Sequence, residues 1–241
     1  MADTGAVSAL YKRHRFPPEI IAYAVWLYYR FALSFRDVEE LLGSRGVTVS
    51  YEAVRLWCGK FGPEFAHKLR CRRRRLGRHW FVDEVFIRLK GVIHYLWRAV
   101  DQNGVVVDIL VQARRDRAAA ERFFRHLLRS SNTVPHTVVT DRLRSYSAAL
   151  PRVLPKVKHQ RGHWLNNRAE NSHQPTRDRE RRMRRFKSPE QAQQFLSIYS
   201  TVSSHLRPRR HRLTAARYRS IRRQRFQQWN TAVQARALAM P

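Results

Sequence analysis

The first third of the chain consists of apolar runs separated by short polar breaks, a pattern that predicts helices. Residues 17–19 (Pro-Pro-Glu) open a run that stays apolar nearly all round as far as Leu33, which indicates a buried helix with proline in its first turn. Ser34, with Asp37 three residues later, is a variant of the capping box. A second helix is therefore expected through Leu42.

A third helix is predicted after the glycine-containing turn of residues 43–48. Ser50 is placed to cap it, and we expect it to end at Phe61 because Gly62-Pro63 follows. Its inner face is apolar and its outer face is polar, with the members Val54, Trp57, Cys58 and Phe61 inside and Tyr51, Glu52 and Arg55 outside. Two helices joined by a short turn favour a helix-turn-helix that contacts DNA through Tyr51 and Arg55. An ordinary three-helix bundle with no DNA role is the alternative.

From His79 the pattern alternates with period two, which is typical of strands. Residues 80–89 and 92–100 predict two strands, and Lys90-Gly91 between them predicts a tight turn. A further strand over residues 105–112 follows an Asn-Gly pair, a strong hairpin signal. The sequence therefore predicts three antiparallel strands in succession.

Helical spacing then returns over residues 116–129, and a short apolar strand over 137–140 stops at Asp141. Three antiparallel strands, a crossover helix and another strand are the opening of a ribonuclease H-like sheet, with the fourth strand parallel to the first. The predicted fold class is α/β, a ribonuclease H-like mixed sheet with flanking helices, preceded by an all-α helix-turn-helix domain.

Three acids are candidates for a metal site: Asp83, Asp141 and Glu170. If the first and fourth strands are neighbours, the two aspartates lie close together, and Glu170 completes a shell for two divalent metals. Strict alternation places Asp83 on the buried face and makes Glu84 a solvent-side ion-pair partner. Each acid also has a structural interpretation: Asp83 as a strand start, Asp141 as a turn residue and Glu170 as the third position of a capping box with Asn167.

The composition supports a polyanion-binding enzyme. The chain has 48 Lys+Arg against 18 Asp+Glu, a formal charge of +30, which predicts salt-sensitive attraction to phosphate backbones. A ribosomal-type protein or a membrane-surface binder is the alternative, but 43% hydrophobic residues and many aromatics indicate a packed core. The two cysteines, Cys58 and Cys71, are interpreted as reduced thiols of a cytoplasmic protein. The longest apolar run, 20–29, is too short for a membrane span.

Basic residues gather at three further places. One helix face is expected to carry Glu170, His173, Arg177, Arg181 and Arg184. On that face an acid would be followed by arginines that bind phosphates. A solvated basic face is the alternative. Residues 67–78 hold seven basic side chains, among them Arg72, Arg73, Arg74 and Arg75. They are expected to form a linker that contacts the phosphates of DNA, with a simply solvated linker as the alternative. The basic tail from Arg207 to Arg225 is expected to lie on DNA or to help dimerise, and residues 1–15 are expected to be frayed.

Several motifs resemble those of the insertion-sequence-six family of bacterial transposases, within the DDE transposase and retroviral integrase superfamily. They are HWFVDEVFIRLKG, YLWRAVDQNG, VVTDRLRSY, LNNRAENSHQPTR and RRFKSPEQAQQFL, in the family's order. The resemblance implies a catalytic triad of Asp83, Asp141 and Glu170, and a basic partner at Arg177. The 28 residues between Asp141 and Glu170 are fewer than is typical of relatives, which implies a shorter connection to the last helix.

The same resemblance implies a function. It implies a DNA transposase that binds terminal inverted repeats, uses two Mg²⁺ ions (Mn²⁺ as a substitute) to nick the 3′ ends, and joins them to target DNA replicatively, with cointegrates as products. Its partners would be double-stranded DNA and further copies of itself, as a homodimer or a larger synaptic assembly. It would act in the bacterial cytoplasm, at the nucleoid, and would not bind a membrane. The alternatives are a DNA-binding regulator with an inactive transposase-like domain and a ribonuclease H-like nuclease.

These expectations divide the chain into four parts. They are a helix-turn-helix domain (1–66), a basic linker (67–78), a ribonuclease H-like catalytic domain (79–204) and a basic helical C-terminal tail (205–241).

Overall fold

The computed structural model describes residues 9–73, 75–182, 186–206, 208 and 213–234. The chain forms two compact units. One is made of Met1–Arg73 together with Thr201–Pro241, and the other is Arg74–Ser200. The second unit is therefore inserted into the chain of the first unit.

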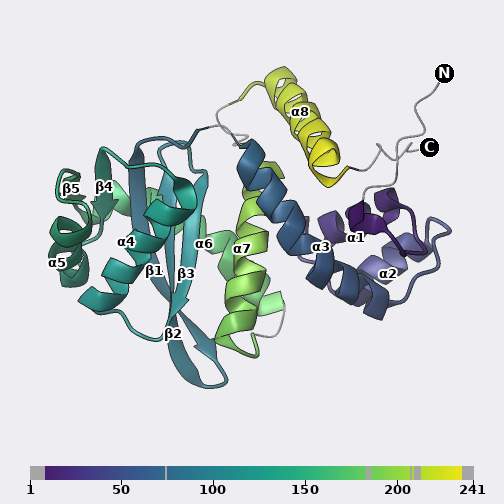
Figure 1. Cartoon of the computed structure of the whole chain (residues 1–241), viewed down its shortest axis with the longest axis horizontal. Helices are drawn as coiled ribbons and strands as arrows, with labels where there is room; N and C mark the ends of the chain where they lie inside the picture. The colour runs from purple at the N-terminus through teal and green to yellow at the C-terminus, as the bar shows by residue number, and fades with distance from the viewer. Residues whose placement is uncertain (1–8, 74, 183–185, 207, 209–212, 235–241) are drawn as a thin grey trace. The chain divides into compact units, whose positions relative to one another are not determined.

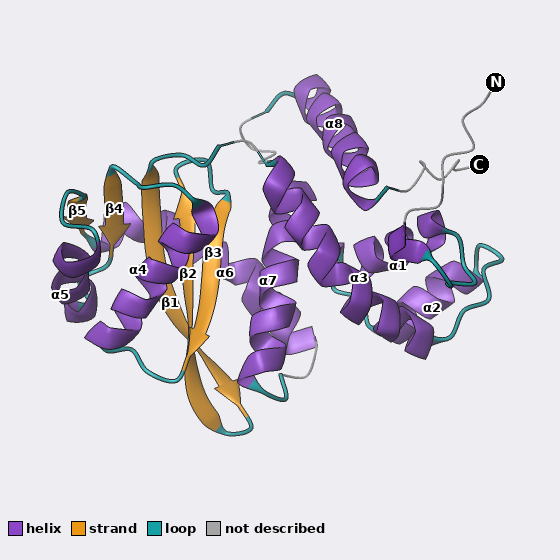
Figure 2. Cartoon of the chain, viewed as in Figure 1, coloured by secondary structure: helices purple, strands orange, loops and turns teal. Residues whose placement is uncertain are grey.

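The first unit is helical (Figures 1 and 2). Its elements are η1 (Ala9–Tyr11), α1 (Pro18–Arg30), α2 (Phe35–Gly43), α3 (Tyr51–Arg72) and α8 (Ala215–Val233), with the end of α7 (Pro189–Leu206). The predicted capping box of α2 is confirmed, because Asp37 N donates to Ser34 Oγ (3.1 Å) and Ser34 N donates to Asp37 Oδ2 (2.8 Å). The predicted inner face of α3 is buried, and Cys58 and Cys71 are both free thiols.

The predicted end of the third helix at Phe61 is wrong. Helix α3 continues through Pro63 to Arg72, so it occupies the first half of the segment that we expected to be a linker. A proline inside a helix removes one hydrogen bond and costs about 3 kcal/mol. The buried side chains of Phe65 and Leu69 offset that cost, since each large apolar group gains about 1.5–3 kcal/mol on burial.

The expectation that residues 1–15 are frayed is also wrong where the structure describes them. The Tyr11 ring is buried and stacks on Phe61 at 5.1 Å between centroids. Its hydroxyl donates to the carbonyl of Val233, in α8, at 2.6 Å. The two ends of the chain are thereby joined within one unit.

The second unit is an α/β sandwich built on a five-stranded mixed sheet (Figure 2). Its strands are β1 (His79–Leu89), β2 (Val92–Asp101), β3 (Val106–Gln112), β4 (Thr137–Thr140) and β5 (Lys158–Arg161), in the order β3-β2-β1-β4-β5. β1 and β4 are parallel, as are β4 and β5, while β2 is antiparallel to both of its neighbours. The predicted ribonuclease H-like sheet, with its fourth strand parallel to the first, is confirmed.

The turns of this sheet follow from local residues. Lys90 and Gly91 both have positive φ (47° and 86°), the conformation of a tight hairpin between β1 and β2. In the second hairpin only Gly104 is left-handed, and the Asp101 side chain holds the loop by accepting from the backbone N–H groups of Asn103 and Val105, both at 2.8 Å. Both hairpins were predicted.

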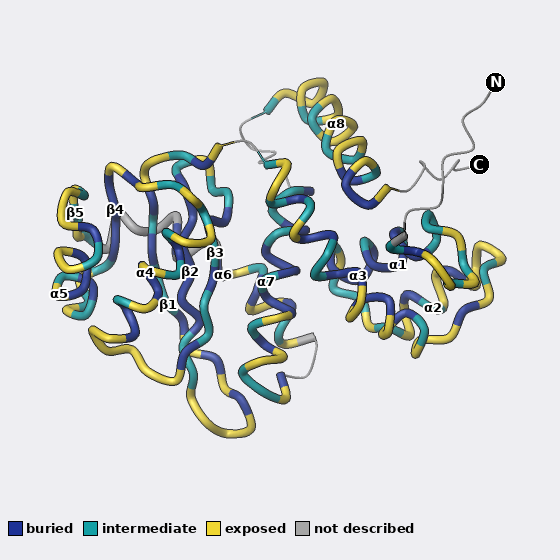
Figure 3. The backbone as a smooth tube through the Cα atoms, in the orientation of Figure 1, coloured by how far each residue is buried: buried dark blue, intermediate teal, exposed yellow. Residues whose placement is uncertain are grey.

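Helices cover both faces of the sheet (Figure 1). α4 (Arg117–Ser131) and α5 (Arg144–Val153) enclose the main core of the unit on one face, where Trp80, Trp97 and Phe123 are fully buried (Figure 3). α6 (His163–Arg182) contacts β1, β2 and β4 from the other face. α7 protects the edge strand β3, since Gln193 accepts from Val111 N (2.7 Å) and donates to Ile109 O (3.3 Å).

Candidate active site

The register of β1 against β4 brings two of the three candidate acids together. His79, Trp80 and Phe81 pair with Thr137, Val138 and Val139, an offset of 58 residues. The same offset carried two residues further places Asp141 beside Asp83. Neighbouring strands lie about 4.8 Å apart, so this register brings the carboxylates of Asp83 and Asp141 near each other.

The surroundings of the two aspartates differ. Asp141 Oδ1 accepts from Leu143 N at 2.9 Å, which fixes the turn that leaves β4. Asp83 lies on the face of β1 that α6 covers, and its side chain is 15% exposed. Asp83 is thus within reach of solvent, whereas the strand around it is largely buried.

The third acid lies on α6, at position 170. The side chain of Glu170 is outside the described residues, so its placement relative to the aspartates stays a prediction. Position 173, one turn later, faces β1: His173 Nε2 lies 3.8 Å from Asp83 Oδ2. Positions three apart share a helix face, so position 170 is on the side of α6 that faces the same strand. Among the described side chains no group of three or more His, Cys, Asp and Glu is arranged to hold a metal.

The capping-box interpretation of Glu170 is wrong. Helix α6 begins at His163, so Asn167 is an interior helix position rather than a cap. Glu170 accordingly lies in the third turn of the helix and not at its start.

A buried cation and a buried imidazole lie beside Asp83. Arg98 is the cross-strand partner of Asp83 on β2 and is 7% exposed; its Nη1 donates to Thr176 Oγ1 on α6 at 3.1 Å. Burial lowers the pKa of Arg98 to about 10, so the guanidinium remains charged at neutral pH. Burial, with the neighbouring charges of Arg98 and Arg177, holds the pKa of His173 well below its ordinary value. His173 is therefore a neutral group near pH 7.

Glu84 corrects one expectation from the sequence. Alternation does place it on the opposite face from Asp83, and it does have an ion-pair partner, Arg115 Nη1 at 3.5 Å. However, its side chain is only 3% exposed, because Tyr146 of α5 covers it and donates a hydrogen bond to its Oε2. Burial, followed by the charge of Asp141, raises the pKa of Glu84 to about 7, against the opposing effects of the Tyr146 hydrogen bond and the Arg115 charge.

Tyr146 reports how closely the acids are grouped. Burial and the Glu84 carboxylate raise the pKa of its hydroxyl well above the ordinary value, and Asp83 and Asp141 contribute in the same direction. The carboxylates of Asp83 and Glu84 on β1, and of Asp141 just after β4, thus act on one buried hydroxyl. Sequence reasoning missed Tyr146 and Arg98 as residues that surround the aspartates, and it gave His173 only a place on the helix face of Glu170. All three stand inside quoted motifs, in the order VVTDRLRSY, YLWRAVDQNG and LNNRAENSHQPTR, which were the available signal.

The predicted phosphate clamps of α6 differ in their surroundings. Arg177 is exposed, and Arg181 is exposed and pairs with Asp178 at 2.8 Å. Arg184 lies outside the described residues. Arg179, in contrast, is buried, with its guanidinium carbon 5.5 Å from the centroid of the Phe195 ring.

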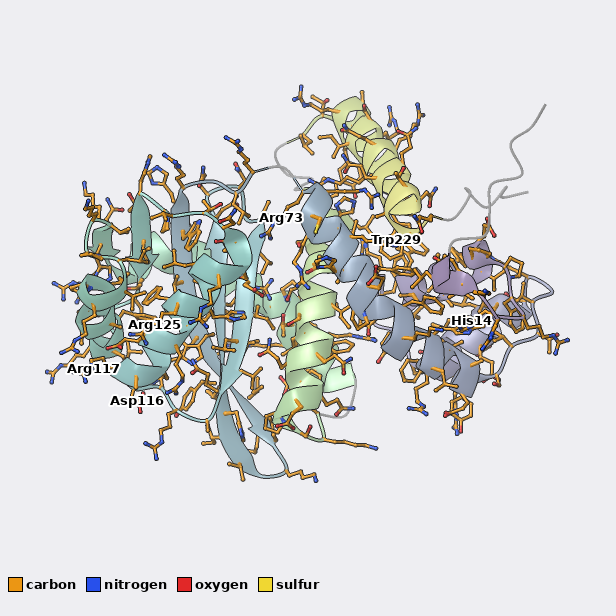
Figure 4. The ribbon with its side chains drawn as sticks, viewed as in Figure 1. His14, Arg73, Asp116, Arg117, Arg125 and Trp229 are labelled. Carbon is orange, nitrogen blue, oxygen red and sulfur yellow. The ribbon has the colours of Figure 1, made fainter. Side chains whose placement is uncertain are left out.

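The candidate DNA contacts of the first unit lie at both ends of α3. Tyr51 is half-exposed, and the guanidinium of Arg36 lies 5.2 Å from its ring centroid. Arg55 donates to Glu52 on the same helix surface at 2.9 Å, which neutralises part of its charge. At the other end Arg72 and Arg75 are exposed, Arg73 (labelled in Figure 4) is half-buried, and Arg74 lies outside the described residues.

Comparison with known proteins shows that this chain is similar to transposases. A model described as a DDE domain matches residues 77–209. The transposase for insertion sequence element IS257 in transposon Tn4003 of Staphylococcus aureus is 31% identical over 177 residues, which cover 71% of this chain and 79% of that protein. The transposase for insertion sequence-like element IS431mec of S. aureus strain N315 is 30% identical over the same shares.

Two solved structures are similar at lower identity. The catalytic core domain of HTLV-2 integrase in complex with magnesium, in its dimeric form, is 15% identical over 44% of this chain and 72% of that one, with a TM-score of 0.35. The catalytic core domain of BIV integrase is 14% identical over 55% of this chain and 86% of that one, with a TM-score of 0.41. Within the described residues, no helix has the length and apolar character needed to cross a membrane.

Proposed function

We propose that this chain, which belongs to the insertion-sequence-six family of DDE transposases, nicks the 3′ ends of its element and joins them to target DNA. The observation that supports the proposal is the parallel register of β1 and β4, which, continued two residues past its last pair, would set Asp141 beside Asp83 at the end of β4. Ligand sites of α/β sheets lie at such strand ends. The DNA substrate, the two reactions and the replicative outcome with cointegrates are all part of the proposal.

The donor set fits a hard divalent cation. Asp83 of β1 and Asp141, the residue after β4, would supply carboxylate oxygens, and Glu170 would supply a third from α6. Oxygen ligands suit Mg²⁺, with Mn²⁺ as a substitute, whereas the neutral nitrogen of His173 is buried behind Asp83. Two bound metal ions would activate the attacking oxygen and stabilise the leaving oxygen of an in-line displacement.

The balance of the two steps is simple. In the first, water attacks the phosphorus at the element end, the P–O3′ bond breaks, and a free 3′-hydroxyl and a 5′-phosphate result. In the second, that hydroxyl attacks a target phosphodiester, a new P–O3′ bond forms, and the target 3′-hydroxyl leaves. No covalent bond to the protein is needed, and the number of phosphodiester bonds is unchanged in the second step.

The remaining residues have positioning and binding roles in this proposal. Arg98 of β2 and His173 of α6 would flank Asp83 and limit its movement. Arg177, with Arg181 and Arg184, would bind phosphates along α6. Tyr51 and Arg55 on α3 would recognise the terminal repeats. The adjoining phosphate backbone of the DNA would be bound by Arg72, Arg73, Arg74 and Arg75. The assembly would be a homodimer or a larger synaptic complex at the bacterial nucleoid.

The test uses Asp141→Asn, which keeps the size of the side chain and removes its charge. With Mg²⁺ and duplexes that carry the inverted repeats flanking the gene, the wild-type protein should yield nicked and joined products, whereas the variant should bind the duplex and nick nothing. Glu121→Gln, an acid of α4 that pairs with Arg125 at 3.0 Å, is the control and should keep full activity. Nicking by Asp141→Asn would show that the metal is held elsewhere.

Two other outcomes would replace the proposal. Cleavage without joining by the wild-type protein would indicate a ribonuclease H-like nuclease. Binding without cleavage under all metal conditions would indicate a DNA-binding regulator with an inactive catalytic unit.

A further inference from the structure

Helix α8 lies beyond residue 209, where the DDE domain match ends, and its two halves differ in character. The second half is an anchor. Trp229 (labelled in Figure 4) is 3% exposed and meets Phe65 of α3 edge-on at 5.6 Å between ring centroids. Phe226 meets Trp26 of α1 at 5.4 Å.

Arg225 fixes the helix at its middle. Its Nη1 donates to the carbonyls of Ser204 (3.3 Å) and His205 (2.9 Å), at the end of α7. His205 in turn contacts the carbonyl of Arg225 through Nε2 at 3.1 Å. This arginine is therefore committed to a structural contact within the first unit.

The first half of α8 is strongly positive. Its four arginines, Arg217, Arg219, Arg222 and Arg223, are all exposed (Figure 3). Within the part of the chain that the structure describes, none of the four pairs with a carboxylate; Arg222 lies over the ring of Tyr218, with its guanidinium carbon 5.8 Å from the centroid. We call these four residues the basic half of α8.

Local electrostatics oppose the helix at this place. Arg219 has like-charged neighbours three and four positions later, at Arg222 and Arg223, and such pairs destabilise a helix. Arg217 lies in the first turn, where the helix dipole disfavours cations. No acid follows position 206 in the chain, so nothing in the sequence of this segment compensates. Local charges that oppose the fold are expected at functional sites, where a binding partner of opposite charge compensates them.

We infer that the basic half of α8 binds the phosphate backbone of double-stranded DNA without reading its sequence. A second copy of the chain is a poor occupant, because each copy carries a formal charge of +30. A lipid surface is also a poor occupant, because the large apolar side chains of α8, Phe226 and Trp229, are used in packing against the first unit. The choice of DNA among polyanions rests on the proposed function.

The length of the basic half sets the expected number of contacts. From Arg217 to Arg223 the helix rises about 9 Å. Phosphates of one strand are spaced about 3.4 Å along the duplex axis, so about three of them lie within reach. Each phosphate contact contributes about 0.9 to the slope of log affinity against log salt concentration.

The test compares salt slopes for binding to a labelled duplex of unrelated sequence, in EDTA so that no cleavage occurs. The α8 variant combines Arg217→Gln, Arg219→Gln, Arg222→Gln and Arg223→Gln. In this variant the slope of log affinity against log salt concentration should be smaller in magnitude by about 3. The affinity lost between 50 and 200 mM salt should accordingly shrink roughly 40-fold relative to wild type. The matched control removes four exposed basic residues of the catalytic unit, with Arg129→Gln, Arg152→Gln, Lys156→Gln and Lys158→Gln combined.

The outcomes separate specific contact from general charge. An unchanged slope in the α8 variant, or an equal fall in the control variant, would overturn the inference. Replacing the same four arginines by lysine should restore the slope, because counterion release depends on charge; failure of lysine to restore it would contradict the inference.

Two further readouts separate DNA contact from a structural role. Without DNA the α8 glutamine variant should melt at the wild-type temperature or above it, since repulsion within the helix is relieved. A lower melting temperature, or a change of oligomeric state with an unchanged slope, would overturn the inference in favour of folding or dimerisation. The measurement needs no metal and no element-end sequence, so its failure is distinct from loss of nicking in the Asp141→Asn experiment.

Discussion

Tyr146 of α5 donates its hydroxyl hydrogen bond to Glu84, the residue that follows Asp83 on β1. The contact joins α5, which comes directly after Asp141, to the strand that carries Asp83. It is made on the face of the sheet opposite to α6. The two aspartates are therefore supported from behind by a buried acid and phenol that do not face the candidate metal site.

Tyr146→Phe should destabilise the protein because it leaves a buried carboxylate without its hydroxyl donor. The expected loss is about 1–3 kcal/mol in the free energy of unfolding, measured with urea at pH 8, where Glu84 is ionised. Tyr51→Phe, at an exposed ring, should change that free energy by less than about 0.5 kcal/mol. Equal effects of the two substitutions would show that the buried hydrogen bond is not stabilising.

Glu84 should make stability fall as the pH rises. Its folded pKa is about 7, against an ordinary value of 4.5, so the folded state holds a proton that the unfolded state has released between these values. The associated stability is complete below pH 4.5 and is lost as the pH passes 7, an amount on the order of 3 kcal/mol. In metal-free buffer, urea unfolding of the wild type minus that of Glu84→Gln should show this decline between pH 5 and 8. A flat difference would contradict the shift.

Trp229→Ala should remove the anchor of α8. The side chain is almost fully buried against Phe65, and truncation of a buried Trp costs about 3–5 kcal/mol. Thermal unfolding of the first unit should show the loss. Leu56→Ala, at a position that is 58% exposed on α3, should be near neutral, and a similar loss there would argue against a specific anchor.

Pro63→Ala should stabilise the protein. Pro63 lies inside α3, where it cannot donate to the carbonyl of Gly59, and the substitution restores that hydrogen bond. The expected gain is about 1–3 kcal/mol, seen as a higher urea midpoint. Pro155→Ala, outside the helices, is the comparison and should produce no such gain. A loss of stability in Pro63→Ala would mean that the helix depends on the proline ring for packing.

The parts of the fold that the sequence predicts well depend on local chemistry. Lys90-Gly91 sets the first hairpin through two left-handed residues, and the Ser34 cap starts α2 through contacts three residues apart. The parallel placement of β4 beside β1 follows from the handedness of a crossover. That placement is the reason why the sequence alone groups Asp83 with Asp141.

The parts that were missed depend on contacts between distant segments. Gly62-Pro63 is a strong local stop signal, but Phe65 beyond it packs against Tyr11 and Trp229, which lie at the two ends of the chain. The burial of Glu84 comes from Tyr146, 62 residues later. In α8 the many arginines obscured an apolar stripe that includes Phe226, Trp229 and Val233. No local pattern contains this information.

The division of the chain between the two units has a consequence for synthesis. Met1–Arg73 cannot finish packing until Trp229 and Val233 have left the ribosome, since Thr201–Pro241 belongs to the same unit. At about 5–20 residues per second, that interval lasts roughly 8–30 seconds. Throughout it the nascent polypeptide carries an unfinished first unit ahead of a second unit that has all its own strands. Prematurely terminated products would therefore hold the complete mixed sheet without a finished first unit.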